Sequence, residues 1–380
     1  MIICIDHILE ENIKFVINKD QIFSDCCVCG GSQKICLDTE SYDVQTMMKS
    51  LIRYNYDEFK YNDHVGGDET FHGLLLDDGF IFSDDVLSNN EVCDDLNDEL
   101  YSIIEVYGNI PIFAGYSDGQ QNMLLEAIKN QEVREIRSLQ EKLEKGNHFE
   151  HEGYIKEIIS SYGNSFLKKI TENNFFYRAR VGYSNSKIAY DGFNRKGQSF
   201  YAPYVNDDIS AVPPLLADQG RANRAGVSFL YCATDMNTAI AEVRPHPTDI
   251  VSVAEFVNMS DLEVFDFSYP NLIDFYDSED KLDSMRMYAT MANIFNKATP
   301  PSLKGRYILS QLISDCIRQQ GYDGILFSST VGEGKNLVVF TPEKMKFVDG
   351  SDKILEVEKV EYTSKECKVI GRDDEFEVYV

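Results

Sequence analysis

The chain has 380 residues and a formal net charge of −27, from 36 basic and 63 acidic side chains. This length provides for two or three domains, and an apolar content of 43% is typical of a folded protein. A chain with this much negative charge repels the phosphate backbone and is unsuited to non-specific binding of nucleic acid. To bind an anionic substrate, it would need several arginines close together in the binding site. No apolar run reaches membrane-spanning length, no signal-peptide pattern follows Met1, and nine cysteines form no regular framework. We therefore expect a cytoplasmic protein with reduced thiols and with no membrane or nucleic-acid partner.

Residues 1–45 contain five of the nine cysteines and are expected to form a small module. Cys26 and Cys29 make a Cys-x-x-Cys pair with a glycine directly after it. A tetrahedral zinc site needs four ligands, commonly supplied as two close pairs, and the sequence shows one pair. The pattern favours ordinary buried thiols, with zinc bound through Cys26 and Cys29 as the alternative. Other cysteine and histidine residues nearby are Cys4, His7 and Cys36.

Residues 46–171 are predicted to be mainly helical, because apolar side chains recur there at helical spacing. HEPN nucleases place a histidine a few residues after an arginine. Here ten residues and a helix stop separate Arg137 from His148, so no RNase activity is predicted. A role in regulation, partner binding or homo-oligomerisation is expected instead. The predicted helices cover residues 47–56, 84–107, 119–146 and 153–170.

From residue 172 onward strands alternate with helices, which predicts an α+β chain whose last domain covers 172–380. Residues 183–200 are polar and contain glycine, and are predicted to form a loop over the functional site. Residues 341–380 alternate apolar and charged side chains, as half-exposed strands at a sheet edge do. The predicted strands are 176–181, 229–231, 248–257, 262–268, 325–327 and 337–340, and the predicted helices are 279–297 and 303–320.

The segment 220–244 is the most informative part of the chain. A Gly-bounded loop with two arginines is followed by an apolar strand that ends at Tyr231. Thr234 or Asp235 is expected to cap a short helix that carries Glu242. A phenol and a carboxylate on two rigid elements can then face one pocket.

This segment resembles the RES family, which is named for an arginine, a glutamate and a serine. Upstream, Phe176–Val181 resembles the aromatic–arginine strand that opens a RES domain. Downstream, Gly321–Ser329 and Gly334–Phe340 resemble the serine segment of the family. The resemblance covers about 172–345, with the motifs inside 175–345. Residues 46–171 resemble the HEPN-associated extension that some RES relatives carry at their N-terminus.

The resemblance implies an ADP-ribosyltransferase-like fold with a mixed sheet, and a toxin that consumes NAD⁺ under the control of an antitoxin. The implied catalytic set is Arg178, Tyr231, Glu242 and Ser329. Arg178 is preferred to Arg180 because it directly follows an aromatic residue. Ser328 and Ser329 form a doublet where one serine should align, and Ser329 is preferred because a spacer normally separates it from the aromatic residue.

These residue types suit glycosidic chemistry on a nucleotide better than a hydrolase triad, since no histidine accompanies them. Glu242 can stabilise an oxocarbenium-like ribose as the nicotinamide–ribose bond breaks. Arg178 and Arg221 can bind the diphosphate, and Tyr231 can stack on or hydrogen-bond the nicotinamide side. Ser329 can bind a phosphate or a ribose hydroxyl. The predicted NAD⁺-binding residues are Arg178, Arg221, Tyr231 and Asn336.

We therefore expect an NAD⁺-degrading enzyme, either a phosphorylase or a glycohydrolase, that acts as a toxin, growth-arrest or defence effector. NAD⁺ is its substrate, inorganic phosphate a candidate second substrate, and an antitoxin or regulatory protein a candidate partner. The alternatives are an ADP-ribosyltransferase, a catalytically silent NAD or ADP-ribose sensor, and a protein–protein module. A Rossmann enzyme is excluded because no G-x-G-x-x-G follows a strand.

Overall fold

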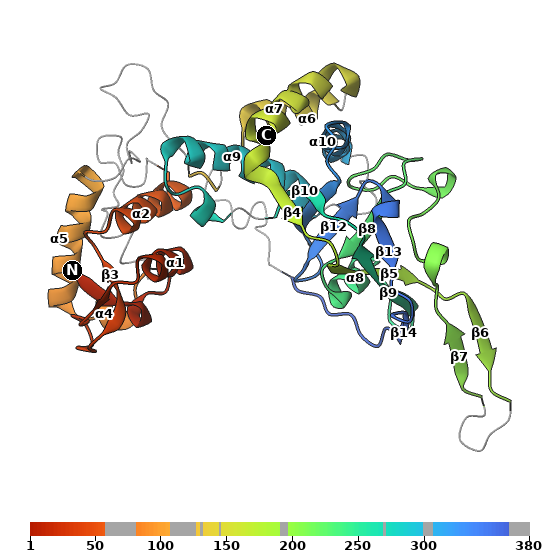
Figure 1. The fold of residues 1–380 in the computed structure, drawn as a ribbon, viewed down its shortest axis with the longest axis horizontal. Coiled ribbons are helices and arrows are strands. Elements are labelled where there is room, and N and C mark those ends of the chain that lie inside the picture. Colours follow the sequence, from red (N-terminus) through yellow and green to blue (C-terminus); the bar gives the residue numbers. More distant parts are fainter. Residues whose placement is uncertain are drawn as a thin grey trace, which may run out of the picture.

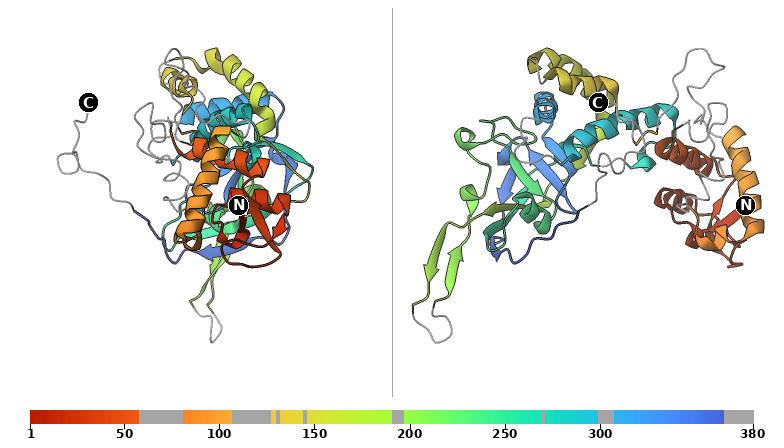
Figure 2. Two further views of the ribbon diagram at one scale, coloured as in Figure 1. Left: turned by 90° about the vertical axis from the view of Figure 1, so that its left-hand side faces the viewer. Right: turned by 180° about the vertical axis from the view of Figure 1, so that it is seen from behind.

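The chain is α+β, as predicted, with helices towards the N-terminus and a large mixed sheet towards the C-terminus (Figure 1). The right-hand view in Figure 2 places the first helices at one end of the molecule and a long hairpin at the other. No helix within the described residues is long and apolar enough to cross a membrane. The structure is a computed structural model that describes residues 1–57, 81–106, 127–129, 132–143, 146–190, 197–268, 271–298 and 307–364.

The first part of the chain is a three-stranded antiparallel sheet packed against helices. The strand order is β1-β3-β2, and the first helix packs on the second. The helix predicted at 47–56 is present but begins earlier, at Tyr42. The elements are β1 (Ile2–Cys4), α1 (Glu11–Asp20), β2 (Phe23–Ser24), β3 (Lys34–Asp38), α2 (Tyr42–Asn55), α4 (Asp84–Leu87) and α5 (Asn90–Val106).

Two predicted helices, 119–146 and 153–170, are longer than the observed ones because tertiary hydrogen bonds override local periodicity. The described helix in the first range is α6 (Arg134–Leu143). Residues 127–129 instead form a turn, where the amides of Ile128 and Lys129 donate to carbonyls at the end of α2. Residues 119–126 lie outside the described part. In the second range, α7 (Glu152–Phe166) is followed by a strand that pairs with β10.

The large sheet has nine strands in the order β13-β9-β5-β8-β12-β11-β10-β4, with β14 also on β9. It is mixed, because β10 and β11 are parallel and the other pairs antiparallel. Strands β13 and β14 account for the edge predicted after residue 341, and residues 365–380 lie outside the described part. The strands are β4 (Leu167–Ile170), β5 (Phe175–Val181), β8 (Leu230–Ala233), β9 (Ile250–Asn258), β10 (Leu262–Asp266), β11 (Gly324–Ser328), β12 (Lys335–Val339), β13 (Met345–Phe347) and β14 (Lys353–Glu356).

Helices cover the sheet and bury its apolar side chains. Both α9 (Glu279–Asn296) and α10 (Ile308–Gln319) pack against β11, and α7 packs against β10. The rings of Phe267 and Phe295 stack at 4.5 Å between centroids in this core. The short helix α8 (Met236–Glu242) packs against β5, β8, β9 and β12. It thereby places its last residue beside the middle of the sheet.

The prediction that residues 183–200 form a loop over the functional site is wrong. This segment contains two antiparallel strands, β6 (Asn185–Ile188) and β7 (Ser199–Ala202). They form a hairpin that extends away from the body of the molecule (Figure 1). The two strands satisfy their backbone hydrogen bonds with each other, so the segment needs no contact with the large sheet.

Candidate functional site

The sheet opens between β5 and β8, and a cavity of about 350 Å³ lies at this opening. Strand β5 pairs with β9 at seven positions but with β8 at one, where Tyr177 faces Ala233. Residues from strands, loops and a helix therefore surround the place where β5 and β8 lack backbone hydrogen bonds to each other. The lining residues are Tyr177, Arg178, Ala179, Gln219, Gly220, Arg221, Tyr231, Cys232, Ala233, Ala239, Glu242, Val243, Arg244, Tyr307, Phe327 and Asn336.

Arg178 spans the opening between the two strands. Its Nε donates to the carbonyl of Ile209 at 2.6 Å, and its Nη1 donates to the carbonyl of Tyr231 at 2.7 Å. These bonds take the place of ladder bonds that β5 and β8 do not make, while the remaining guanidinium N–H groups stay available to the cavity. Burial lowers the pKa of Arg178, but an arginine remains protonated. Arg180, two residues on, donates to the carbonyl of Asp208 and is not part of the lining.

Tyr231 is held from both sides of its hydroxyl. The hydroxyl donates to Oδ1 of Asn223 at 2.7 Å and accepts from the amide of Ala222 at 3.1 Å. Burial raises the pKa of the phenol, so it stays protonated. With its hydroxyl bonded to the loop, Tyr231 presents its ring to the cavity and fixes the loop that carries Arg221.

Arg221 lies against two aromatic rings. Its guanidinium carbon is 5.6 Å from the ring centroids of both Tyr307 and Phe327, and its Nη1 donates to the carbonyl of Phe295. The loop backbone is also fixed, because Ser310 Oγ donates to the carbonyl of Arg221 at 2.6 Å. A cation so placed over aromatic rings is oriented before any ligand binds.

Glu242, the last residue of α8, is oriented by two side chains from the other side of the cavity. The N-cap of this helix is Asp235, whose carboxylate accepts from the amide of Thr238 at 2.8 Å. Ser329 Oγ donates to Oε1 of Glu242 at 2.7 Å, and Asn336 Nδ2 donates to the same oxygen at 2.6 Å. No hydrogen bond from the described residues reaches the second oxygen, Oε2. The carboxylate is therefore fixed in direction with one oxygen available to a ligand.

Ser329 is itself positioned by a tight turn. Its Oγ accepts from the amides of Val331 and Gly332 at 3.2 and 3.0 Å, and its own amide donates to the carbonyl of Gly334. The neighbouring Ser328 makes a different contact, in which its backbone amide donates to Oδ1 of Asn296. Of the two serines in the doublet, Ser329 is the one whose hydroxyl reaches the glutamate.

The cavity also contains residues that the sequence did not single out. Arg244 follows Glu242 by two positions, in a left-handed conformation with φ of 48°. Among the described residues its side chain has no ion pair. Tyr177, Gln219, Tyr307 and Phe327 complete the walls. The position of Arg244, just after a short helix that carries Glu242, could have identified it as a cavity residue from the sequence. No feature of the sequence around Tyr307 distinguishes it from a tyrosine of the core.

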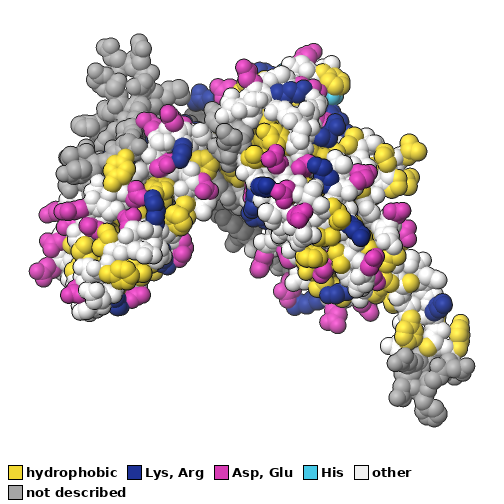
Figure 3. Space-filling view, viewed as in Figure 1, with side chains coloured by type: hydrophobic (Ala, Val, Ile, Leu, Met, Phe, Trp, Pro, Cys, Tyr) yellow, Lys and Arg dark blue, Asp and Glu magenta, His cyan; other side chains and the backbone are white. Residues whose placement is uncertain are grey.

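The cavity is locally cationic in an acidic protein. The charged residues of the lining are three arginines (Arg178, Arg221 and Arg244) and one carboxylate, Glu242. The lining therefore has a net charge of +2, whereas the whole chain has a net charge of −27. On the face shown in Figure 3, acidic and basic side chains are interspersed over the surface. The cavity lining therefore favours an anionic ligand. Cys26 and Cys29 lie between β2 and β3 in the N-terminal part and do not line this cavity.

The family comparison concerns the part of the chain that builds this cavity. Residues 195–362, a little under half of the chain, match the family model of the RES domain. The chain contains a RES domain. The match includes Arg221, Tyr231, Glu242 and Ser329, whereas Arg178 lies before the matched segment of the RES domain.

The structure is similar to the crystal structure of the M. tuberculosis MbcT–MbcA toxin–antitoxin complex, with 11% sequence identity and a TM-score of 0.29 over 53% of this chain and 91% of that chain. Because the TM-score is below 0.5, the evidence for the RES domain is the match to the family model. No curated protein matches the chain.

Proposed function

We propose that the RES domain cleaves the nicotinamide–ribose bond of NAD⁺ in the cavity between β5, β8 and α8. The observation that carries this proposal is the combination of three arginines with one oriented carboxylate in a single cavity. NAD⁺ has the matching features, a diphosphate and a ribose that becomes cationic when nicotinamide leaves. The RES family resemblance supports the same reaction.

The arginines would bind the diphosphate. Arg244 has no ion pair among the described residues, and Arg221 is oriented by Tyr307 and Phe327. Guanidinium groups bind phosphate oxygens through two parallel hydrogen bonds, which fixes the ligand as well as attracting it. The free N–H groups of Arg178 add to this site from the sheet opening. The rings of Tyr177 and Tyr231 offer stacking surfaces for nicotinamide.

Glu242 would act on the ribose. When the C1′–N bond breaks, its electron pair leaves with the neutral nicotinamide, and positive charge develops on C1′ and the ring oxygen. The free Oε2 of Glu242 can stabilise that charge or accept from a ribose hydroxyl. Ser329 and Asn336 hold Oε1, so the carboxylate does not reorganise as the charge develops. Ser329 thus serves as a positioning residue in this proposal.

The acceptor is inorganic phosphate or water, and the two give different products. The test is incubation of the full-length protein with NAD⁺, with and without phosphate, followed by mass spectrometry of the products. Phosphorolysis yields phosphorylated ADP-ribose and needs phosphate, whereas hydrolysis yields ADP-ribose in both mixtures. Absence of nicotinamide release from both mixtures would count against either enzyme. As a RES enzyme it would act as a toxin-type effector in the cytoplasm, restrained by a partner protein.

A further inference from the structure

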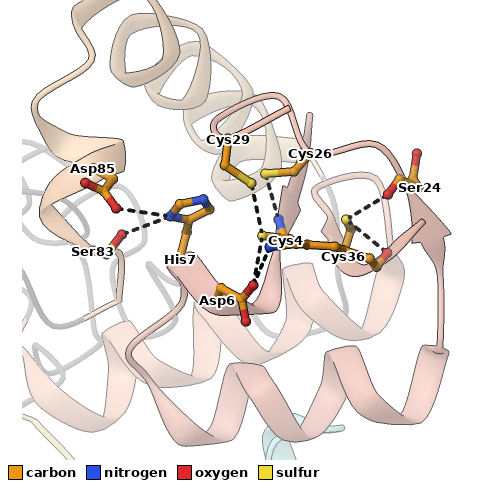
Figure 4. A network of polar contacts seen from close by, with 10 residues as sticks. Cys4, Asp6, His7, Ser24, Cys26, Cys29, Cys36, Ser83 and Asp85 are labelled. Atoms are coloured by element: carbon orange, nitrogen blue, oxygen red, sulfur yellow. Dashed lines mark hydrogen bonds and ion pairs between the residues drawn. The ribbon is translucent and has the colours of Figure 1, made fainter. Parts of the chain in front are cut away.

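Four side chains that can bind a metal meet beside the N-terminal sheet (Figure 4), and none of them lines the RES cavity. The ligand atoms of Cys4, His7, Cys26 and Cys29 all lie within 4.8 Å of one another. Cys4 Sγ and Cys29 Sγ are 3.8 Å apart. With Zn–S bonds of about 2.3 Å, the edge of a tetrahedron is about 3.8 Å, so this spacing fits two ligands of one zinc ion. A disulfide would bring the sulfurs to about 2.05 Å, so this pair is not bonded.

The backbone around Cys26 and Cys29 forms a knuckle that presents both thiols on one side. The amide of Gly30 donates to the carbonyl of Cys26 at 2.9 Å, and Gly30 has φ of 65°, a conformation that glycine adopts readily. The amide of Cys4 donates to Cys26 Sγ at 3.3 Å. An amide aimed at a sulfur favours the thiolate, which is the form that binds a metal.

His7 supplies the second, independent observation. Its imidazole is buried, and its Nδ1 lies 3.4 Å from Ser83 Oγ and 3.7 Å from Asp85 Oδ2. Its Nε2 is buried with no hydrogen-bond partner in the described part of the chain. A buried polar nitrogen left unpaired is unfavourable unless it has a ligand. A carboxylate on one ring nitrogen and a metal on the other is the usual arrangement of a zinc-binding histidine.

Two neighbouring thiols are excluded by their surroundings. Cys36 is buried, but its Sγ donates to the carbonyls of Lys34 and Ser24 at 3.3 and 3.7 Å. Cys27 is exposed, as Cys29 is, but it does not belong to the group of side chains whose ligand atoms lie within 4.8 Å of one another. These two residues are close in sequence and similar in chemistry to the four, so they serve as matched controls.

We propose that Cys4, His7, Cys26 and Cys29 bind one Zn²⁺ in a closed, structural Cys₃His site. Three thiolates and one imidazole select zinc over oxygen-preferring cations, and four protein ligands leave no position for a substrate. The ion joins β1 to the knuckle, and through His7, Ser83 and Asp85 it joins both to the start of α4. The site therefore stabilises the N-terminal part of the chain and takes no part in the chemistry of the RES domain.

The test measures zinc and uses the full-length protein. We expect one zinc per chain by elemental mass spectrometry after exhaustive dialysis. Cys29→Ser and His7→Ala should lose most of the zinc, while Cys27→Ser and Cys36→Ser should keep it. Cobalt added to the metal-free wild-type protein should give the intense visible absorption of tetrahedral cobalt–thiolate, a readout that does not depend on any variant folding.

Two results would overturn the zinc site. The first is a wild-type protein that contains no zinc and gives no cobalt–thiolate absorption. The second is equal zinc loss from Cys27→Ser and Cys29→Ser. Neither readout uses NAD⁺, so failure of this proposal is distinct from failure of the proposed activity.

Discussion

Replacing Ser329 with alanine tests how Glu242 is positioned. The change removes the 2.7 Å hydrogen bond from Ser329 Oγ to Oε1 of Glu242. A hydrogen bond to a charged group contributes about 1.5–3 kcal/mol, which corresponds to roughly a tenfold to hundredfold change in rate. Asn336 still donates to the same oxygen at 2.6 Å. We therefore expect the lower end of this range, about a tenfold fall in kcat/KM for NAD⁺ cleavage, chiefly through kcat.

The neighbouring Ser328 provides the control for this experiment. The hydroxyl of Ser328 makes no hydrogen bond within the described residues, and the bond from its backbone amide to Asn296 remains in alanine. Ser328→Ala should therefore retain activity within about twofold, since surface changes away from such contacts have small effects. Steady-state nicotinamide release by both variants, with their unfolding temperatures, makes the comparison. Equal losses in the two variants, or full activity in Ser329→Ala, would refute the positioning role.

Further predictions concern the cavity walls. Arg244→Ala should raise KM for NAD⁺ about tenfold, because a charge-assisted hydrogen bond to the diphosphate is lost. An unchanged KM in steady-state assays would show that Arg244 does not bind NAD⁺. Gly220→Ala should lower the free energy of unfolding by about 1–3 kcal/mol, because a Cβ there would lie 2.5 Å from Asn223 Oδ1 and 2.7 Å from the Tyr231 hydroxyl. Denaturant unfolding measures the loss of stability. An unchanged unfolding midpoint would contradict the close contact of Gly220 with Asn223 and Tyr231. Burial raises the pKa of Cys232 from 9.0 to about 12, so the unfolded chain loses this proton first and stability falls as pH rises from 9 to 12. Cys232→Ala should make that fall shallower in urea titrations, and an identical pH profile would contradict the burial.

Much of the fold could be predicted from local patterns, and the errors have tertiary causes. Residue patterns located β9 and α9 to within two residues, and the family resemblance located β5 to within one. The helix predicted at 153–170 failed at its end, because pairing with β10 turns the last four residues into a strand. The hairpin around residues 185–202 was also missed, since its strands pair only with each other and bury no regular apolar face.

The sequence predicted those site residues that lie in segments resembling the RES family. The segment 220–244 and the serine doublet located Tyr231, Glu242 and Ser329 on elements that meet in space. The sequence could not show that Arg178 bridges two diverging strands, because that role depends on the sheet opening. Of the four proposed zinc ligands, the sequence assigned only Cys26 and Cys29 to a candidate site. It could not show that Cys4 and His7 lie beside this pair, because that depends on the antiparallel pairing of β1 with β3.

The most direct test of the proposed activity compares NAD⁺ binding with nicotinamide release in the same preparations. Glu242→Gln keeps the shape of the side chain but removes its charge, and Glu356→Gln on the exposed edge strand β14 is the matched control. We predict release by the wild type and by Glu356→Gln, and NAD⁺ binding with at least a hundredfold slower release by Glu242→Gln, as expected for the loss of a transition-state charge contact of about 3 kcal/mol. Binding of NAD⁺ by all three proteins without release from any of them would contradict an enzyme and identify the RES domain as a silent sensor.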